Sequence, residues 1–410
     1  MRSVRLLSVL ALALIAGCSA AQPKKSVTVE GREKWQEARA GVLYSLAKGQ
    51  FEAGNFEAAR KSLNEAATLA PKTAAIYVLS ARIAIEQSQL ELALNTLATV
   101  ATLDPKNAEA DYFMGVVYQR WQKPDLALDC YTRASTKQPA ELAYILAQSE
   151  MLVAMDRQDE ALALLRSKMQ YFENSAVLRD SIGQLLFQRG EYALAADMLR
   201  IASVLAPEDQ FIRERLAMAL YLQGDYREAV EVLSRLLGDP RYAKRADLLV
   251  AQGECLLHVN RVRDARDSFE LASQHDPSSV AVWLGLAKAA AQLDDTPRVE
   301  MSLRKAMAIQ ADNPEVHLML GYLRIQQGKL AEAVSLFHRA SALNVRDTVS
   351  LCMIGYTLEK MGQKGLAGTY YARALKIRPD DVETGLLPLR GKRQEAPRSF
   401  CGGGDAGRIP

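Results

Sequence analysis

The sequence predicts an all-α solenoid of about ten helix-turn-helix repeats. Three observations support this prediction. A small residue and, twelve positions later, an alanine recur in a 34-residue frame in nine of ten units. A large apolar residue follows that alanine by four positions, and a proline often closes the unit. A frame kept over about 340 residues indicates one supersecondary unit stacked on itself.

The repeats occupy residues 40–381, and every position below is counted from the first residue of its unit. The units start at residues 40, 74, 108, 142, 176, 210, 246, 280, 314 and 348, with a two-residue slip after the start at 210. Position 8 is small in every unit: Ala47, Ala81, Gly115, Ser149, Gly183, Ala217, Gly253, Ala287, Gly321 and Gly355. Position 20 is alanine in all units except the eighth, which has Val299.

The spacing within a unit predicts two packed helices. Positions 4, 7, 8 and 11 share one face of a first helix, and positions 20, 24 and 27 share one face of a second. Small side chains at positions 8 and 20 let the helix axes approach, while large residues at position 24 fill the space beside them. Glycines such as Gly54 and Gly190 suit the turn between the helices. Pro124 and Pro297 suit the start of the second helix.

Two units fit the frame less well. In the fourth unit Lys168 stands at position 27, where alanine is usual, and neither the fourth nor the eighth unit has the closing proline. The best-formed unit is the third, with Met114, Gly115, Tyr118, Ala127, Tyr131, Ala134 and Pro139. This set resembles the signature of the tetratricopeptide repeat family. The resemblance implies an all-α, right-handed superhelical solenoid with a concave groove lined by the first helix of each pair.

The N-terminus predicts export and lipid anchoring. Residues 1–17 resemble a lipoprotein signal peptide, with Arg2 and Arg5 before an apolar run that is too short to span a bilayer. The run ends in Ile15-Ala16-Gly17-Cys18, which resembles a bacterial lipobox, so Cys18 is the expected lipidation site. An ordinary secretory peptide with an incidental cysteine is the alternative. Ser19 resembles the outer-membrane sorting pattern. We therefore expect the periplasmic face of the outer membrane, with the inner membrane as the alternative.

The segments on either side of the repeats have separate expected roles. Residues 18–39 are expected to hold the lipidated cysteine, a tether and an N-terminal extension of the first helix from about residue 32. Residues 382–410 are expected to form a short cap followed by a disordered tail rich in Gly, Arg and Pro. Cys130 and Cys255 lie in separate repeats, too far apart for a disulfide, and are expected to be buried thiols.

Charge and motifs exclude several classes of function. The 51 basic and 48 acidic residues nearly cancel, which argues against the basic stripe that nucleic acid requires. No zincin helix, phosphate-binding loop or nucleophile elbow occurs, and no histidine has a second ligand at helical spacing. Gly402, Gly404 and Gly407 match a dinucleotide fingerprint by letters, without its strand and helix. We expect no catalysis, no cofactor, no metal and no small-molecule substrate.

The family resemblance places positions 2, 5, 9, 12 and 13 on the concave face. Aromatic and charged residues alternate there, which suits a peptide or helix lying in a groove. The candidate partner-binding residues are Tyr44, Arg82, Tyr112, Gln119, Arg120, Phe187, Tyr221, Tyr322 and Tyr356, and the other aromatic residues at these positions are Phe51 and Phe211. The alternative for each aromatic residue is packing against a neighbouring repeat.

These expectations combine into a hypothesis about function. The protein is expected to be a non-enzymatic, lipid-anchored scaffold that binds partner proteins in its groove. Lipoproteins that resemble it serve the assembly of pili and secretins or the export of exopolysaccharide, and the leading hypothesis is an assembly machine of the pilus or secretin type. The alternative is an accessory subunit that binds a polysaccharide or peptidoglycan synthase.

Overall fold

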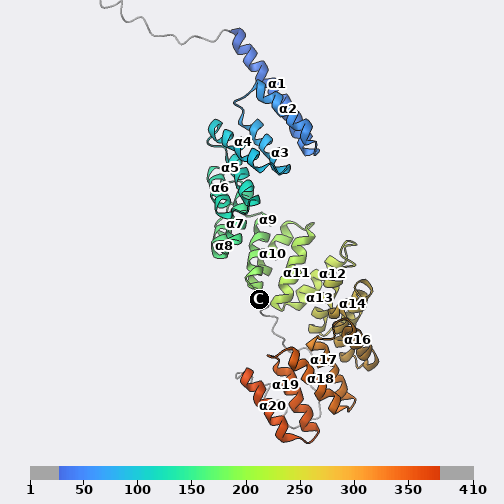
Figure 1. The fold of residues 1–410 in the computed structure, drawn as a ribbon. Coiled ribbons are helices and arrows are strands. Elements are labelled where there is room, and N and C mark those ends of the chain that lie inside the picture. The colour runs from blue at the N-terminus through green and yellow to red at the C-terminus, as the bar shows by residue number, and fades with distance from the viewer. Residues whose placement is uncertain (1–26, 379–410) are drawn as a thin grey trace, which may run out of the picture. The chain divides into compact units, whose positions relative to one another are not determined.

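A computed structural model describes residues 27–378 and contains, within them, twenty α-helices and no strand (Figure 1). The chain divides into two compact units, residues 1–173 and 174–410. We call them the N-terminal unit and the C-terminal unit. Helices that follow one another along the chain pack in pairs, and each pair contributes one repeat. The predicted fold class, an all-helical repeat solenoid, is confirmed.

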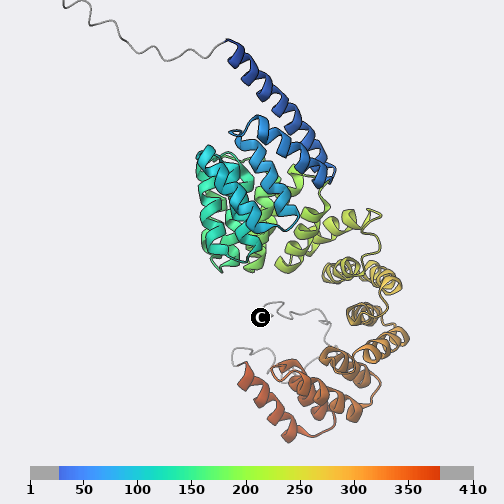
Figure 2. The same ribbon diagram turned by 45° about the horizontal axis from the view of Figure 1, so that its top comes forward.

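The N-terminal unit holds the first four repeats. Its helices are α1 (Val27–Glu52), α2 (Phe56–Leu69), α3 (Ala74–Glu86), α4 (Leu90–Leu103), α5 (Ala108–Arg120), α6 (Pro124–Lys137), α7 (Leu142–Ala154) and α8 (Gln158–Ser167). At 26 residues, α1 is about twice as long as the other first helices, and Figure 2 shows it running beyond α2. It begins at Val27, so the helical extension includes five residues that precede the expected residue 32.

The C-terminal unit holds the other six repeats. Its helices are α9 (Ala176–Gln188), α10 (Tyr192–Leu205), α11 (Gln210–Gln223), α12 (Tyr226–Leu237), α13 (Ala246–His258), α14 (Val262–His275), α15 (Val280–Gln292), α16 (Thr296–Ile309), α17 (Pro314–Gln326), α18 (Leu330–Leu343), α19 (Thr348–Lys360) and α20 (Lys364–Ile377). From the second repeat onward, each first helix begins at the residue where the sequence frame starts its unit.

The small residues at position 8 mark the closest approach of the two helices in a repeat. A Cβ atom added to Gly115 would lie 2.4 Å from the ring of Tyr131, and one added to Gly321 would lie 2.4 Å from the ring of Phe337. Alanines at position 20 are buried in the same interface, as with Ala127 and Ala333. The core of each repeat therefore depends on side chains small enough to admit one large residue.

The turn between the two helices uses one backbone conformation throughout. Position 15 has a positive φ in all ten repeats, between 56° and 92°. Five repeats have glycine there, which adopts this region without steric cost. The other five use Ser88, Gln122, Asp156, Asn260 and Asp294. The glycines that the sequence assigned to this turn are thus confirmed, and the remaining repeats form the same turn with less suitable residues.

The fourth repeat has the shortest second helix of the ten. Its second helix, α8, has 10 residues and ends at Ser167, immediately before Lys168 at position 27. The boundary between the two compact units follows at Glu173 and Asn174. By contrast, the eighth repeat keeps a full α16 of 14 residues, with Val299 buried in place of alanine. A weak match to the frame therefore marked a structural break in one repeat and not in the other.

Several sequence predictions concern residues outside the described range. The signal peptide at residues 1–17, Cys18, the tether up to residue 26 and the cap and tail at residues 382–410 lie there. Within residues 27–378, Cys130 and Cys255 are buried thiols, as expected. No helix in this range has both the length and the apolar character needed to cross a bilayer.

Candidate partner-binding face

The candidate site is the set of side chains at positions 2, 5, 9, 12 and 13 of the first helices, which we call the first-helix face. Its positions fall into two groups. Position 5 is exposed in no repeat, and among positions 9 and 12 the exposed residues are Lys48, Glu150 and Gln119. Position 2 is exposed in nine repeats and position 13 in eight. Positions 5, 9 and 12 therefore form a half-buried floor between two exposed edges.

Arg82 organises the floor in the first three repeats. Its guanidinium lies 4.9 Å from the ring centre of Phe51 and 5.3 Å from that of Phe113, so three repeats contribute to one cation–π stack. Its Nη1 atom also lies 3.9 Å from a carboxylate oxygen of Glu109 on the exposed edge. These contacts hold Arg82 in place, so it is a positioned cation rather than a mobile one.

Tyr112 is the centre of an aromatic cluster in the third and fourth repeats. Its ring centre lies 4.9 Å from that of Tyr144, 5.2 Å from that of Phe113 and 5.5 Å from that of Tyr131. Burial raises the pKa of Tyr112 above its ordinary value, so its phenol stays protonated at neutral pH. The Tyr131 hydroxyl donates a hydrogen bond of 2.6 Å to Gln119 Oε1.

Arg120 and Gln119 are the candidates in this unit that remain exposed. The guanidinium of Arg120 donates to the carbonyl oxygen of Ile85, and its Nη2 atom lies 3.9 Å from Glu86 Oε1. Arg120 therefore bridges the ends of two first helices while part of it faces solvent. Tyr44, the candidate in the first repeat, is half-buried, and burial raises its pKa.

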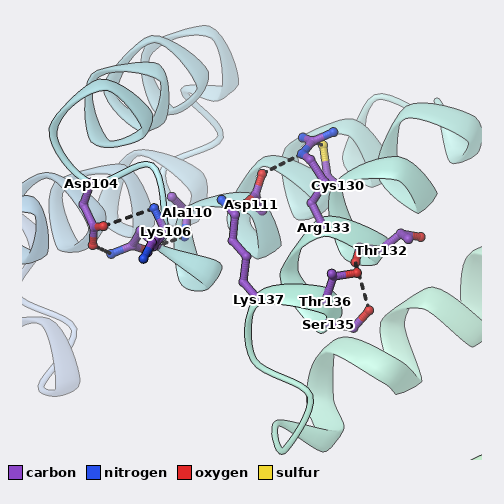
Figure 3. A network of polar contacts seen from close by, with 11 residues as sticks. Asp104, Lys106, Ala110, Asp111, Cys130, Thr132, Arg133, Ser135, Thr136 and Lys137 are labelled. Carbon is purple, nitrogen blue, oxygen red and sulfur yellow. Dashed lines mark hydrogen bonds and ion pairs between the residues drawn. The ribbon is translucent and has the colours of Figure 1, made fainter.

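Beside this floor lies a buried carboxylate, Asp111, at position 4 (Figure 3). It accepts a hydrogen bond of 2.8 Å from Arg133 Nε and is ion-paired with Lys137. Arg133 also donates to the sulfur of Cys130 at 3.1 Å. Burial nevertheless raises the pKa of the Cys130 thiol, although the guanidinium opposes that shift. The thiol is therefore protonated at neutral pH, and the network joins α5 to α6 as a structural element.

In the C-terminal unit, ion pairs connect successive repeats along the floor. Asp180, which is 9% exposed, accepts two hydrogen bonds from Arg215, at 2.7 and 2.6 Å. Arg245 repeats this arrangement one repeat later, with Glu214 at 2.8 Å. Further along, Lys288 lies 2.7 Å from Glu315. Because each pair joins neighbouring repeats, the charges of the floor already have partners within the chain.

The polar cluster around Tyr221 spans the sixth and seventh repeats. The Tyr221 hydroxyl donates to a carboxylate oxygen of Glu254, and its ring contacts that of Tyr226 edge to face. His258 stacks on Tyr226, with ring centres 3.9 Å apart and planes 7° from parallel. Burial lowers the pKa of His258, and Lys288 adds to this effect while Glu254 opposes it. The imidazole is therefore neutral at neutral pH.

The remaining candidates are half-buried too. Tyr322 contacts Phe337 edge to face, with ring centres 5.6 Å apart, and burial raises its pKa to about 12. Phe187 contacts Tyr192 in the same manner at 5.3 Å. Lys360 lies 5.1 Å above the ring of Tyr356. The ring of Tyr112 thus contacts that of Tyr144 in the next repeat, whereas the rings of Tyr221 and Tyr322 contact aromatic rings of their own repeats.

Sequence reasoning missed one exposed element of the first-helix face. Val177 and Phe211 occupy position 2 of the fifth and sixth repeats and are 56% and 66% exposed. Phe211 was noted for its aromatic ring, but Val177 was not singled out. The available signal was a large apolar residue at position 2, where most repeats have a small or charged one. Adjacent exposed apolar residues at one edge can anchor a partner.

The face offers little for chemistry within residues 27–378. This range contains no cluster of three or more histidine, cysteine or acidic residues that could hold a metal ion. Burial raises the pKa of Cys255 to about 12, so this thiol is not a nucleophile at neutral pH. The arrangement is suited to holding a partner through packing and hydrogen bonds.

Comparisons with known proteins agree with the repeat architecture. Two tetratricopeptide repeat models match residues 50–117 and 181–246, and a model of the C-terminal domain of cilia and flagella-associated protein 70 matches residues 221–390. No curated protein matches the sequence.

Solved structures show similar helical arrangements at low sequence identity. YrrB, described as a protein with an unusual peptide-binding site, is 17% identical over 46% of this chain and 96% of its own, with a TM-score of 0.43. Pseudomonas aeruginosa pilF is 18% identical over 52% and 96%, with a TM-score of 0.43. A repeat protein from Parabacteroides merdae is 17% identical over 62% and 99%, with a TM-score of 0.41. Two segments of the chain thus match models of the tetratricopeptide repeat, and the ten helix pairs form a solenoid of the same kind.

Proposed function

We propose that the protein is a non-catalytic scaffold that holds partner proteins on its first-helix face. The observation that carries the proposal is the contrast between floor and edges. Contacts within the chain fix the floor, as in the Arg82 stack and the Asp180–Arg215 pair, while positions 2 and 13 stay exposed. A surface ordered before binding loses little conformational entropy when a partner docks.

The chemistry of the exposed edges indicates the kind of partner. In the fifth and sixth repeats the edge at position 2 presents Val177 and Phe211, while position 13 holds the exposed Gln188 in the fifth repeat and the half-buried Leu222 in the sixth. A peptide or helix with apolar side chains along one side matches this arrangement. We therefore place the partner contact in the C-terminal unit, with Phe211 as its principal anchor.

Crosslinking in intact cells, followed by purification from solubilised envelope, tests this placement. The test variant carries Val177→Ala and Phe211→Ala, and the matched control carries Val204→Ala, because Val204 is 74% exposed on the second helix α10. We expect the wild type and the control to recover the same stoichiometric partner and the test variant to lose at least nine-tenths of it. Recovery that is equal for all three proteins, or no partner for any of them, would contradict the proposal.

We further propose that Cys18 carries lipid and that the scaffold serves an assembly machine of the bacterial envelope, of the pilus or secretin type. The sequence Ile15-Ala16-Gly17-Cys18 after an apolar run supports the anchor. Several acyl chains on one residue give stable membrane attachment, at about 0.8 kcal/mol for each buried methylene. The helix α1 begins at Val27, which leaves a short connection between anchor and repeats.

Metabolic labelling with a palmitate analogue tests the anchor. Wild-type protein is expected to be labelled and to enter the detergent phase on Triton X-114 partition, whereas Cys18→Ala is expected to do neither. An unlabelled wild type in the aqueous phase would overturn the anchor. Mass spectrometry of the crosslinked partners then decides the system, since pilus or secretin components support the proposal and a polysaccharide or peptidoglycan synthase supports the alternative.

A further inference from the structure

The first helix of the first repeat has a face that its counterparts bury. In the second repeat, Ile76 at position 3 and Ile83 at position 10 pack into one cluster with Leu63 of the preceding second helix, α2. Position 3 and position 10 are buried in every later repeat. On α1 the same positions are Val42 and Gly49, and both are exposed. No helix of the described chain covers this side of α1.

The uncovered face forms an apolar stripe along α1. Trp35, Val42 and Leu46 are 60%, 70% and 51% exposed and follow one another at spacings of seven and four, which places them on one side of a helix. Ala38 and Gly49 lie on the same side. Three large apolar residues at this spacing form a surface that packs well against a second helix.

Packing within its own repeat does not require a glycine at residue 49. A Cβ atom added to it would meet no atom within 4 Å, and the same is true of Gly31 on the same stripe. In the other nine repeats position 10 carries a larger residue. A glycine inside a helix lowers its stability relative to alanine. The space left at Gly49 is therefore explained best by a large side chain from another helix.

The stripe is complementary to itself when two copies run antiparallel. With Val42 opposite Val42 of the second copy, Trp35 comes opposite Gly49 and Leu46 opposite Ala38, so each of the two largest residues meets a small one. The same register places Arg32 opposite Glu52, an attractive pair. The described helix carries four acidic and four basic residues, so two copies do not repel each other. A two-fold symmetric interface requires complementarity of this kind.

We propose that α1 pairs with α1 of a second copy of this chain, antiparallel and centred on Val42. The interface is isologous, with Trp35 of each copy seated over Gly49 of the other. It uses the side of α1 that lies opposite Ala40 and Ala47, which are buried within the first repeat. The pairing needs neither the lipid anchor nor a bound partner, so its failure would leave the proposed function untouched.

Cysteine crosslinking of the full chain tests the register. Val42→Cys is expected to form a disulfide-linked dimer on mild oxidation with copper phenanthroline, because the two thiols face each other across the symmetry axis. Mixed Trp35→Cys and Gly49→Cys chains are expected to crosslink to each other. Trp35→Cys alone is not, because its two copies lie about 21 Å apart in the antiparallel register. Glu37→Cys, exposed on another side of α1, is the control, and the wild-type chain gives the background.

Gly49→Leu provides a second test that leaves the repeat intact. Because nothing lies within 4 Å of an added Cβ, the substitution is expected to keep the unfolding midpoint of the monomer unchanged or slightly higher. It is expected to weaken dimerisation at least tenfold in sedimentation equilibrium of the purified full chain. The proposal would be overturned by a wild type that is monomeric at all concentrations or by a Gly49→Leu dimer of normal affinity. It would also be overturned by crosslinks from residue 35 to residue 35, or by a Val42→Cys chain that captures another protein instead of a second copy.

Discussion

The second and seventh repeats close the same helix–helix contact with different residues. In the second repeat Ala81 of α3 and Leu97 of α4 are both fully buried. In the seventh, Gly253 of α13 lies against the ring of Phe269 of α14, and a Cβ on this glycine would lie 2.6 Å from it. The contact therefore has a fixed amount of space, which the residues at positions 8 and 24 share between them.

Eight of the ten repeats follow this rule, and the exceptions are the fourth, with Ser149 and Leu165, and the fifth, with Gly183 and Leu199. Every repeat with an aromatic residue at position 24 has glycine at position 8, and every repeat with alanine at position 8 has leucine at position 24. The aromatic pairs are Gly115 with Tyr131, Gly253 with Phe269, Gly321 with Phe337 and Gly355 with Tyr371. Helix propensity favours alanine, so the glycines are retained for space rather than for helix formation.

The largest effect is expected at Phe269, which is enclosed on two sides. Its ring meets Gly253 within its own repeat and Gly285 of the next, where an added Cβ would lie 2.2 Å away. Phe269→Ala leaves a cavity between two glycines that cannot fill it, and we expect the free energy of unfolding to fall by about 3–5 kcal/mol. Hydrogen exchange of α13, α14 and α15 measures this loss locally, which suits a repeat protein that need not unfold in one step.

Phe211→Ala is the matched control for Phe269→Ala, because Phe211 is 66% exposed. We expect the free energy of unfolding to change by no more than about 0.5 kcal/mol in this variant. Equal losses at the two positions would show that the glycine-lined contact is no more important to stability than an exposed ring.

The comparison also explains what the sequence could and could not predict. The helix pairs followed from the spacing of small and large residues, because that contact lies inside one repeat and recurs in each. The break after α8 had a signal in Lys168 at position 27, but Val299 gave a similar signal in the eighth repeat, where α16 is complete. Whether a poor match ends a helix depends on the surrounding packing, which spacing does not contain.

The burial of the side chains on the first-helix face could not be predicted, for the same reason. Position alone placed Arg82, Tyr112 and Tyr221 on that face, but their exposure depends on the side chains of neighbouring repeats. Phe51 and Phe113 enclose Arg82, and Glu254 accepts the Tyr221 hydroxyl. These residues differ from repeat to repeat, so no repeat pattern reveals them. The exposed Val177 and Phe211 became apparent from the structure.

An intermediate effect is expected when the glycine and phenylalanine of the ninth repeat are replaced by the alanine and leucine that the second repeat has at the same positions. Gly321→Ala places a methyl group 2.4 Å from the ring of Phe337, and we expect a loss of about 1–3 kcal/mol from overpacking. Adding Phe337→Leu recreates the pair Ala and Leu and is expected to recover about 0.5–3 kcal/mol as a coupling energy. A double-mutant cycle in urea measures it, and strictly additive losses would contradict the shared-space explanation.

The smallest effect is expected at position 15, in the turn between the two helices of a repeat. There the repeats have different residues but the same backbone conformation. Gln122 has a φ of 56°, a region in which a side chain costs about 1–2 kcal/mol, while Gly190 occupies the equivalent position at 76°. Gln122→Gly removes that strain but adds flexibility to the unfolded chain, so we expect a net gain of about 0.5 kcal/mol. Gly190→Ala is the reverse change and is expected to lower the free energy of unfolding by about 1 kcal/mol through backbone strain alone, because no atom of the surrounding structure lies within 4 Å of the added Cβ. Thermal unfolding of both variants checks the pair. A lower stability of Gln122→Gly would mean that the glutamine side chain stabilises the turn by more than its backbone strain costs. Glycine would then be the less stabilising of the two residues at position 15.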